Sequence, residues 1–157
     1  MLKIPSKLSV GISITLSVIF FLACIVGAFI MPSLTDLLIN TYDNIGNRAD
    51  ISNSGRVFVL ALAYAVLAVV SLADSLLFFL LCRVHKGQVF TADSVALIRG
   101  VSWCCFLLGA VFGTLGIYFQ LSLIVAFAAV FLGICLRVVK NVIEEATEIK
   151  SENDLTV

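Results

Sequence analysis

The sequence predicts an all-α, polytopic membrane protein with four transmembrane helices. Of its 157 residues, 61% are apolar and only 13% are charged, whereas a soluble domain carries about 25% charged residues. The apolar residues are concentrated in four runs, each close to the about 20 residues that a helix needs to cross a bilayer. A segment inside lipid must satisfy its own backbone hydrogen bonds, and each run is therefore expected to be a helix.

The four runs carry almost no charge. The first has no charged side chain, and the second has only Asp74. The first run is also longer than the 7–15 residues of a signal-peptide core, so we expect it to remain as a transmembrane helix. The expected spans are residues 8–31, 57–82, 98–119 and 121–140.

Lysine and arginine are divided unevenly between the segments that connect these runs. Eight lie at the N-terminus, around the second connection or beyond the last apolar run, and two lie in the first connection. Short loops rich in these residues stay in the cytoplasm. We therefore expect both termini to be cytoplasmic, with an outer loop over 32–56, an inner loop over 83–97 and a cytoplasmic tail over 141–157.

The inner loop contains the signals of a helix start. Thr91 is suited to an N-cap, Asp93 would lie near the positive end of the helix dipole, and Phe90 can contact Val95 across the first turn. The third helix is therefore expected to begin at Ala92. Thr91 could also be read as a phosphorylation site, but a cap accounts for it without regulation.

The tail has an amphipathic pattern. Val139, Val142, Ala146 and Ile149 are spaced by three, four and three residues, with acidic residues on other faces. We expect a cytoplasmic helical extension after the fourth span. Packing of this stripe against the protein's own inner loop is the simpler interpretation, and docking of a soluble partner is the alternative.

Asp74 is the first candidate for an intramembrane site. An aspartate inside a span costs about 2.5–3.5 kcal/mol on insertion scales. Asp74 is expected to lie about 12 Å from the inner membrane interface, at about 1.5 Å per helical residue. Arg137 is the expected partner if the second and fourth helices are neighbours, with Arg99 as another. The group could be a proton or cation site, a buried structural pair, or an uncharged aspartic acid. The polar side chains expected to share its helix face are Tyr64, Ser71 and Ser75.

Small residues and cysteines have simpler explanations. Gly109 and Gly113 on the third helix, and Ser13 and Ser17 on the first, are spaced for close helix packing. The five cysteines lie in or beside the spans and are expected to act as small apolar residues. No catalytic motif or metal-ligand set is present in the sequence. We therefore expect no enzyme activity, cofactor or metal.

Three segments carry a family resemblance: residues 86–91, residues 94–99 and the ending 149–157. They resemble the signatures of a prokaryotic four-helix membrane family catalogued as domain of unknown function 2975, although Ser94 stands where the family often has asparagine. The resemblance implies a bacterial inner-membrane protein with no established activity. Members of this family are often encoded beside a small helix-turn-helix regulator. The resemblance supplies no functional residue for this chain.

The expected function is that of a non-enzymatic regulatory or accessory protein in the cell membrane that binds a cytoplasmic protein, such as a small transcription regulator. The balance of ten basic and ten acidic residues does not indicate direct nucleic-acid binding. The alternative is a small transporter or channel component, or an immunity protein, that uses Asp74. Self-association is compatible with the sequence but has no support in it. The residues expected to bind the partner are Lys86, Phe90, Thr91, Arg99, Glu152 and Asp154.

Overall fold

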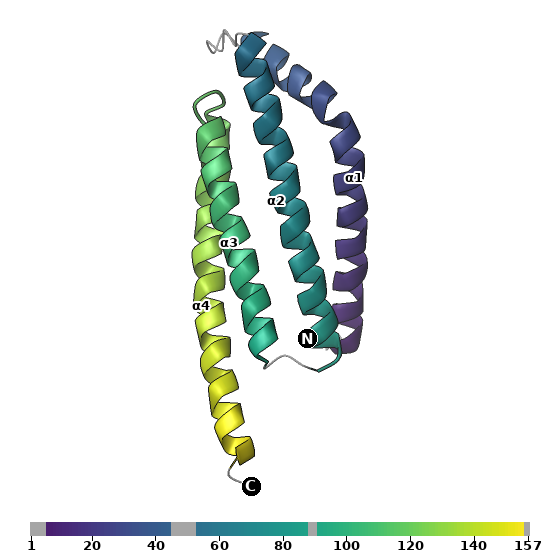
Figure 1. The fold of residues 1–157 in the computed structure, drawn as a ribbon. Helices are drawn as coiled ribbons and strands as arrows, with labels where there is room; N and C mark the ends of the chain where they lie inside the picture. The colour runs from purple at the N-terminus through teal and green to yellow at the C-terminus, as the bar shows by residue number, and fades with distance from the viewer. Residues whose placement is uncertain (1–5, 45–52, 88–90, 156–157) are drawn as a thin grey trace, which may run out of the picture.

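The computed structural model of the chain describes the backbone of residues 6–44, 53–87 and 91–155, and the side chains of 10–42, 54–87 and 91–150. These segments form four helices, and each is long and apolar enough to cross a membrane. The expected all-α fold with four potential spans is therefore confirmed. The helices are α1 (Ser6–Asn44), α2 (Asn53–His85), α3 (Ala92–Leu115) and α4 (Leu121–Leu155) (Figure 1).

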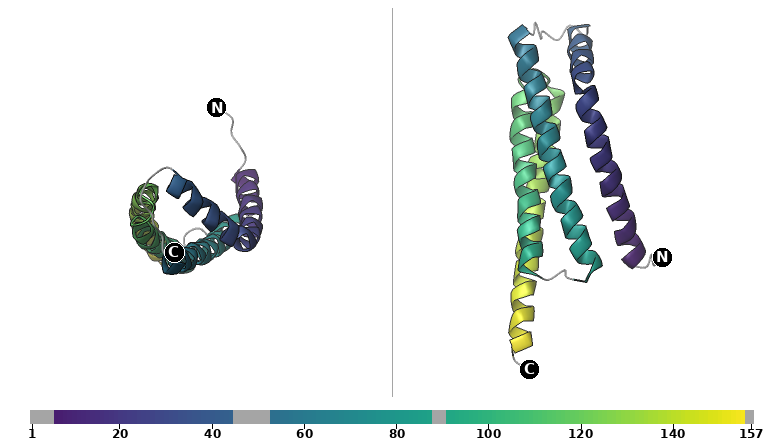
Figure 2. Two further views of the ribbon diagram at one scale, coloured as in Figure 1. Left: turned by 90° about the horizontal axis from the view of Figure 1, so that it is seen from above. Right: turned by 45° about the vertical axis from the view of Figure 1, so that its right-hand side comes forward.

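The helices form an open curve instead of a closed bundle. Within the described residues, α1 packs along α2, α2 along α3 and α3 along α4, and no other pair of helices packs along its length. The view from above in Figure 2 shows this arrangement, with α1 at one end of the curve and the α3–α4 pair at the other. A concave face is therefore left between α1 and α3.

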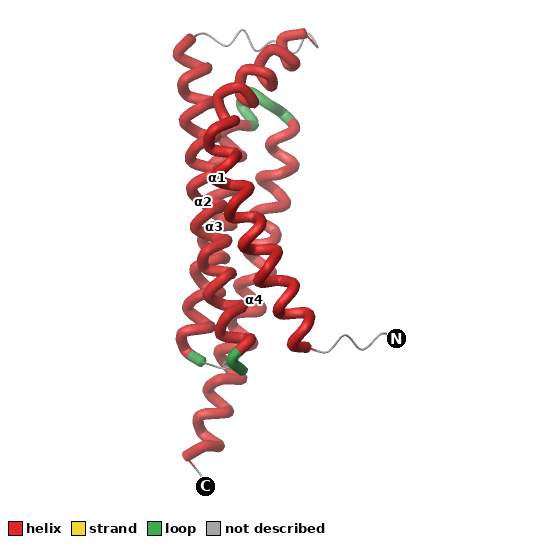
Figure 3. Tube along the Cα trace, turned by 90° about the vertical axis from the view of Figure 1, so that its right-hand side faces the viewer, coloured by secondary structure: helices red, strands yellow, loops and turns green. Residues whose placement is uncertain are grey.

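The two ends of the molecule differ in charge. One end carries Arg83, His85 and Lys86 where α2 ends, and it is also approached by the first residues of α3 and the last third of α4. We call this the basic end. The opposite end holds the last turns of α1 and the short turn 116–120 between α3 and α4, and Figure 3 shows the two ends well separated. We call it the turn end.

α1 continues through Pro32 and bends toward the other helices in its final turns, so helix occupies residues 32–44 of the segment assigned to the outer loop (Figure 1). Proline has no backbone N–H, and the carbonyl of Ala28 therefore lacks its usual helical donor. The hydroxyl of Tyr64 on α2 donates to this carbonyl oxygen at 3.1 Å. A side chain of the neighbouring helix thus satisfies the backbone group that the proline leaves free.

The variant Tyr64→Phe tests this bond. It leaves the ring in place but removes the donor, and we expect it to lower the free energy of unfolding by about 1 kcal/mol, within the range measured for hydrogen bonds between membrane helices. Tyr118→Phe is the control, because in the described part of the chain no hydrogen bond of the Tyr118 hydroxyl is found. The measurement is unfolding in mixed micelles. Equal effects of the two substitutions would contradict the assignment.

The bent part of α1 closes the turn end with a small core. Ile39 is almost fully buried there and clusters with Val59, Leu115 and Phe119. The ring of Tyr42 meets that of Phe119 edge-on, with 4.8 Å between centroids. Because α1 bends over α2, it reaches the α3–α4 turn although the two ends of the curve do not pack along their length.

α3 and α4 form the close antiparallel hairpin that the short connection predicts. The start of α3 is also as expected: Thr91 is the N-cap, and its hydroxyl oxygen accepts the backbone N–H of Ser94 at 3.3 Å. In the middle of the hairpin, buried Ser102 donates to the carbonyl oxygen of Gly133 at 2.8 Å. Small residues allow this approach of the two backbones.

α4 is much longer than its partner. It has 35 residues against 24 in α3, a surplus of about 16 Å at 1.5 Å per residue. Figure 1 shows its last turns projecting beyond the other helices at the basic end. The amphipathic extension is therefore a direct continuation of the fourth helix.

Candidate functional site

Asp74 lies at the seam between α1 and α2. Its carboxylate oxygen Oδ1 accepts a hydrogen bond from the hydroxyl of Ser17 at 2.8 Å. Both side chains are buried, with 8% of Asp74 and 6% of Ser17 exposed. Within the described residues, Ser17 is the donor that reaches this carboxylate. The pair thus places the acidic group of α2 against α1, in the apolar part of both helices.

The other polar side chains of the Asp74 face do not join this bond. The hydroxyls of Ser71 and Ser75 each donate to the carbonyl oxygen four residues earlier in α2, at 2.8 Å in both cases. Tyr64 bonds to α1 near Pro32 instead. On the predicted face, Tyr64 and Asp74 therefore bond to α1, whereas the hydroxyls of the two serines bond to backbone carbonyls of α2.

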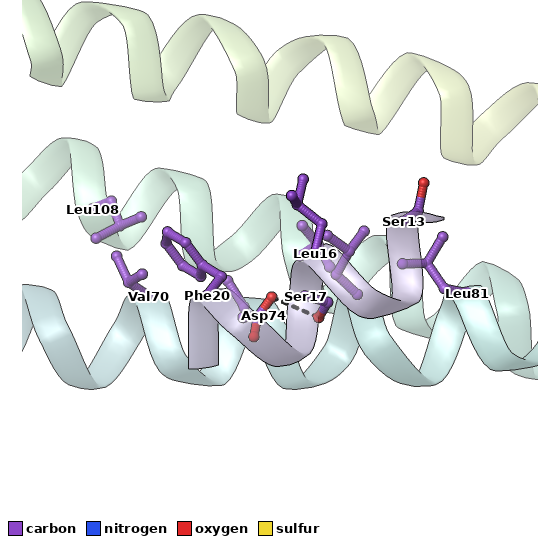
Figure 4. A pocket seen from close by; sticks show the side chains of 11 residues that line it. Ser13, Leu16, Ser17, Phe20, Val70, Asp74, Leu81 and Leu108 are labelled. Carbon is purple, nitrogen blue, oxygen red and sulfur yellow. Dashed lines mark hydrogen bonds between the residues drawn. The ribbon is translucent and has the colours of Figure 1, made fainter. Parts of the chain in front are cut away.

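A cavity of about 570 Å³ opens beside Asp74 on the concave face of the curve. Its walls come from α1, α2 and α3, and Figure 4 shows Asp74 and Ser17 at its floor with Leu16 and Phe20 beside them. Apart from Asp74, Ser13 and Ser17, its lining is aliphatic or aromatic. Such a cavity suits an apolar molecule or chain that also presents one group able to interact with a carboxylate.

Asp74 and Ser17 also border a second hollow. It has a volume of about 240 Å³ and is lined by residues of α1 and α2 alone, including Phe21 and Phe78. The Asp74–Ser17 bond therefore separates two spaces, and a change in this bond would alter the walls of both.

The structure does not bring Arg137 to Asp74. α2 and α4 do not pack together, because α3 lies between them along the curve. The guanidinium of Arg137 lies over the ring of Trp103 on α3 instead, with 5.6 Å from Cζ to the ring centroid. Arg99, the other expected partner, pairs with Glu144 on α4 at 3.3 Å. The expected ionic partners of Asp74 are therefore replaced by a neutral hydroxyl.

The residues expected to bind a partner are spread over the basic end. Lys86 is exposed beyond α2, Thr91 caps α3, and Arg99 lies one to two turns into α3. Phe90 lies outside the described residues, and so do the side chains of Glu152 and Asp154, although both belong to helix α4. Arg83 pairs with Asp93 at 2.9 Å and links the end of α2 to the start of α3.

The sequence matches one family model over residues 40–157, about three quarters of the chain. The model describes a protein of unknown function, DUF2975. The chain belongs to the DUF2975 family. No curated protein and no solved structure matches it.

The DUF2975 match contains Asp74, the cations that α2, α3 and α4 place at the basic end, and the projecting end of α4, but it begins after Ser17. Ser17 is the site residue that the sequence did not assign to Asp74. Its spacing from Ser13 marked it as a packing residue, and nothing in the sequence alone specifies which turn of α1 faces Asp74. The one available signal was its polar hydroxyl in an apolar span, and it shares that signal with Ser13.

Proposed function

We propose that the protein is a non-enzymatic regulatory or accessory protein of the cell membrane that binds a soluble cytoplasmic protein through the projecting end of α4. The proposed orientation has both termini in the cytoplasm and rests on the excess of lysine and arginine at the basic end. The observation that carries the proposal is the length of α4, whose last turns extend beyond the rest of the fold.

The projecting end of α4, and the turn just before it, present apolar side chains that the described residues do not cover. Val142 is 61% exposed and Ile149 is 55% exposed, although the expected stripe also contains the half-buried Ala146. This exposure argues against the simpler interpretation, in which the stripe packs on the protein's own inner loop. Apolar residues on one face of a free helix are the usual anchors of a helix that binds in a groove.

The charge of this segment indicates the chemistry of the partner. Residues 141–157 contain five acidic residues and one lysine, although the chain as a whole has equal numbers of basic and acidic residues. An acidic helix is repelled by anionic lipid, so it is not suited to lie on the membrane surface. It suits a basic groove with an apolar floor, and such a groove occurs in proteins that bind nucleic acid. The proposed partner is therefore a basic soluble protein, such as a small transcription regulator.

The double variant Val142→Ser/Ile149→Ser tests the proposal in the full-length protein. We expect at least a ten-fold loss of affinity for the partner, because two central apolar anchors are removed. The measurement combines photocrosslinking from a probe at position 145 with affinity measurement on the purified partner. Asn141→Ser, an exposed polar change on the same helix, is the control and is expected to leave binding unchanged.

Three further results decide the chemistry of the partner. The complex should weaken steeply with salt, duplex DNA should compete with α4 for the groove, and Glu145→Lys/Glu148→Lys should abolish binding. A crosslinked protein that is acidic, or that binds the serine variant equally well, would refute the proposal. Retention of binding in Asp74→Asn is expected, because Asp74 is remote from this end of the protein.

A second candidate function rests on the cavity beside Asp74. A small transporter or channel component, or an immunity protein, could use a single carboxylate in an apolar cavity to bind a proton or a lipophilic cation. In that case Asp74→Asn abolishes flux or protection, and the variant Val142→Ser/Ile149→Ser leaves it intact. The two candidates therefore predict opposite outcomes for the same pair of variants.

A further inference from the structure

The basic end contains a cluster of cations that neither proposed function uses. Arg99 of α3 and Arg137 and Lys140 of α4 surround a hollow of about 40 Å³ together with Trp103 and Ser102. The three cations lie where the apolar run of α4 gives way to its polar end. This is the depth at which a transmembrane helix meets the lipid headgroups.

The cluster has an excess of positive charge. Arg99 and Lys140 both pair with the same carboxylate, that of Glu144. In the part of the chain that the structure describes, Arg137 has no carboxylate within ion-pairing distance, and it is held over the indole of Trp103. Among the described residues, these three cations thus share one acidic partner, Glu144. The planar guanidinium of Arg137 retains N–H donors for another acceptor.

The size and surroundings of the hollow limit what can bind there. Its volume of about 40 Å³ exceeds the about 10–15 Å³ that one water molecule needs, so it admits the oxygens of a phosphate group, whereas a sugar ring or a base is too large for it. Toward the middle of the membrane, the next turns of α3 and α4 present the exposed side chains of Leu107 and Ile134. An acyl chain attached to that phosphate would lie against these residues.

We propose that Arg99, Arg137 and Lys140 form a site for the phosphodiester headgroup of an anionic phospholipid, whose acyl chain lies along Leu107 and Ile134. Basic pockets between helices at a membrane surface bind such headgroups. The site belongs to the membrane-facing side of the α3–α4 hairpin, and its occupation does not depend on what binds to the end of α4. Bound lipid would neutralise the cluster and hold the hairpin at a fixed depth.

Trp103 is the single tryptophan of the chain and lies within this site, so its fluorescence reports occupation directly. The full-length protein is placed in bilayers that contain phosphatidylglycerol or phosphatidylcholine with dibrominated acyl chains, which quench nearby tryptophan. We expect phosphatidylglycerol to associate at least five-fold more strongly than phosphatidylcholine, since each basic group near an anionic surface contributes about that factor.

The triple variant Arg99→Gln/Arg137→Gln/Lys140→Gln should remove this preference, so that phosphatidylglycerol and phosphatidylcholine associate about equally. Its matched control, Lys7→Gln/Lys86→Gln/Lys150→Gln, removes the same number of charges elsewhere at the basic end. This control should keep the preference for phosphatidylglycerol. Arg137→Gln alone breaks no ion pair in the described part of the chain and serves as a second variant if the triple variant is unstable. Equal quenching by both lipids in the wild-type protein, or an equal loss in the control, would overturn the proposal.

A third arm distinguishes lipid from a soluble phosphate. Inorganic phosphate or glycerophosphoglycerol is added at millimolar concentration to bilayers that contain the brominated phosphatidylglycerol. If the site holds a lipid, neither compound restores the fluorescence, because the acyl chain contributes to binding. If either compound displaces the lipid, the site binds soluble phosphate and the lipid assignment is wrong.

Discussion

Gly109→Ala is expected to destabilise the protein, whereas the same substitution four residues later, Gly113→Ala, is expected to stabilise it. A Cβ atom added at Gly109 would lie 2.5 Å from Cγ2 of Val130 and 3.4 Å from the carbonyl oxygen of Ala126. Overpacking of this kind costs about 1–3 kcal/mol, and Val130 has a β-branched side chain with few alternative rotamers. The backbones of α3 and α4 must therefore separate, which also strains the bond from Ser102 to Gly133.

Gly113 provides the matched control because nothing lies within 4 Å of a Cβ atom added there. Alanine is favoured over glycine in a helix by about 1 kcal/mol, and no steric cost opposes this gain. The gain from helix propensity is common to both positions, so the free energies of unfolding of the two variants should differ by the overpacking cost of about 1–3 kcal/mol, measured by steric trapping in bicelles. Similar effects at both positions would mean that Gly109 does not mediate the close contact of the hairpin.

The fold was largely predictable from the sequence because the physics of a bilayer acts on whole segments. A run such as 57–82 must be helical in lipid whatever its neighbours are, and the N-cap at Thr91 depends only on residues of the same turn. The continuation of α1 through Pro32 was less predictable. It depends on the bond from Tyr64, which joins positions far apart in the sequence.

The sequence predicts that Asp74 is buried, but it does not predict the partner of Asp74, because that contact also joins positions far apart in the sequence. The cost of burying Asp74 is a property of its own segment, and that cost correctly indicated a buried residue with a partner. The choice between Arg137 and Ser17 depends on the order of the helices in space. Charge complementarity favours Arg137, but its selection requires α2 and α4 to be neighbours, whereas the open curve places α1 against α2 instead.

Ser17→Ala is expected to lower the free energy of unfolding by about 1–2 kcal/mol, because it leaves the carboxylate of Asp74 without its donor in an apolar environment. Ser71→Ala is the control. Within the described residues, the hydroxyl of Ser71 bonds only to its own helix, and its removal should cost less than about 0.5 kcal/mol. Unfolding in mixed micelles measures both variants, and equal effects would contradict the importance of the bond between α1 and α2.

The double variant Ser17→Ala/Asp74→Leu then shows why the carboxylate is present. Removing one partner of a buried polar pair leaves an unsatisfied group, but replacing both partners by apolar groups is often neutral or stabilising. We expect the double variant to regain at least the stability lost in Ser17→Ala, since leucine fits the apolar lining of the cavity. Recovery would show that the fold does not need Asp74, and would favour a role for its carboxylate in what the cavity binds. A double variant less stable than Ser17→Ala would show that Asp74 is structural, and the second candidate function would lose its support.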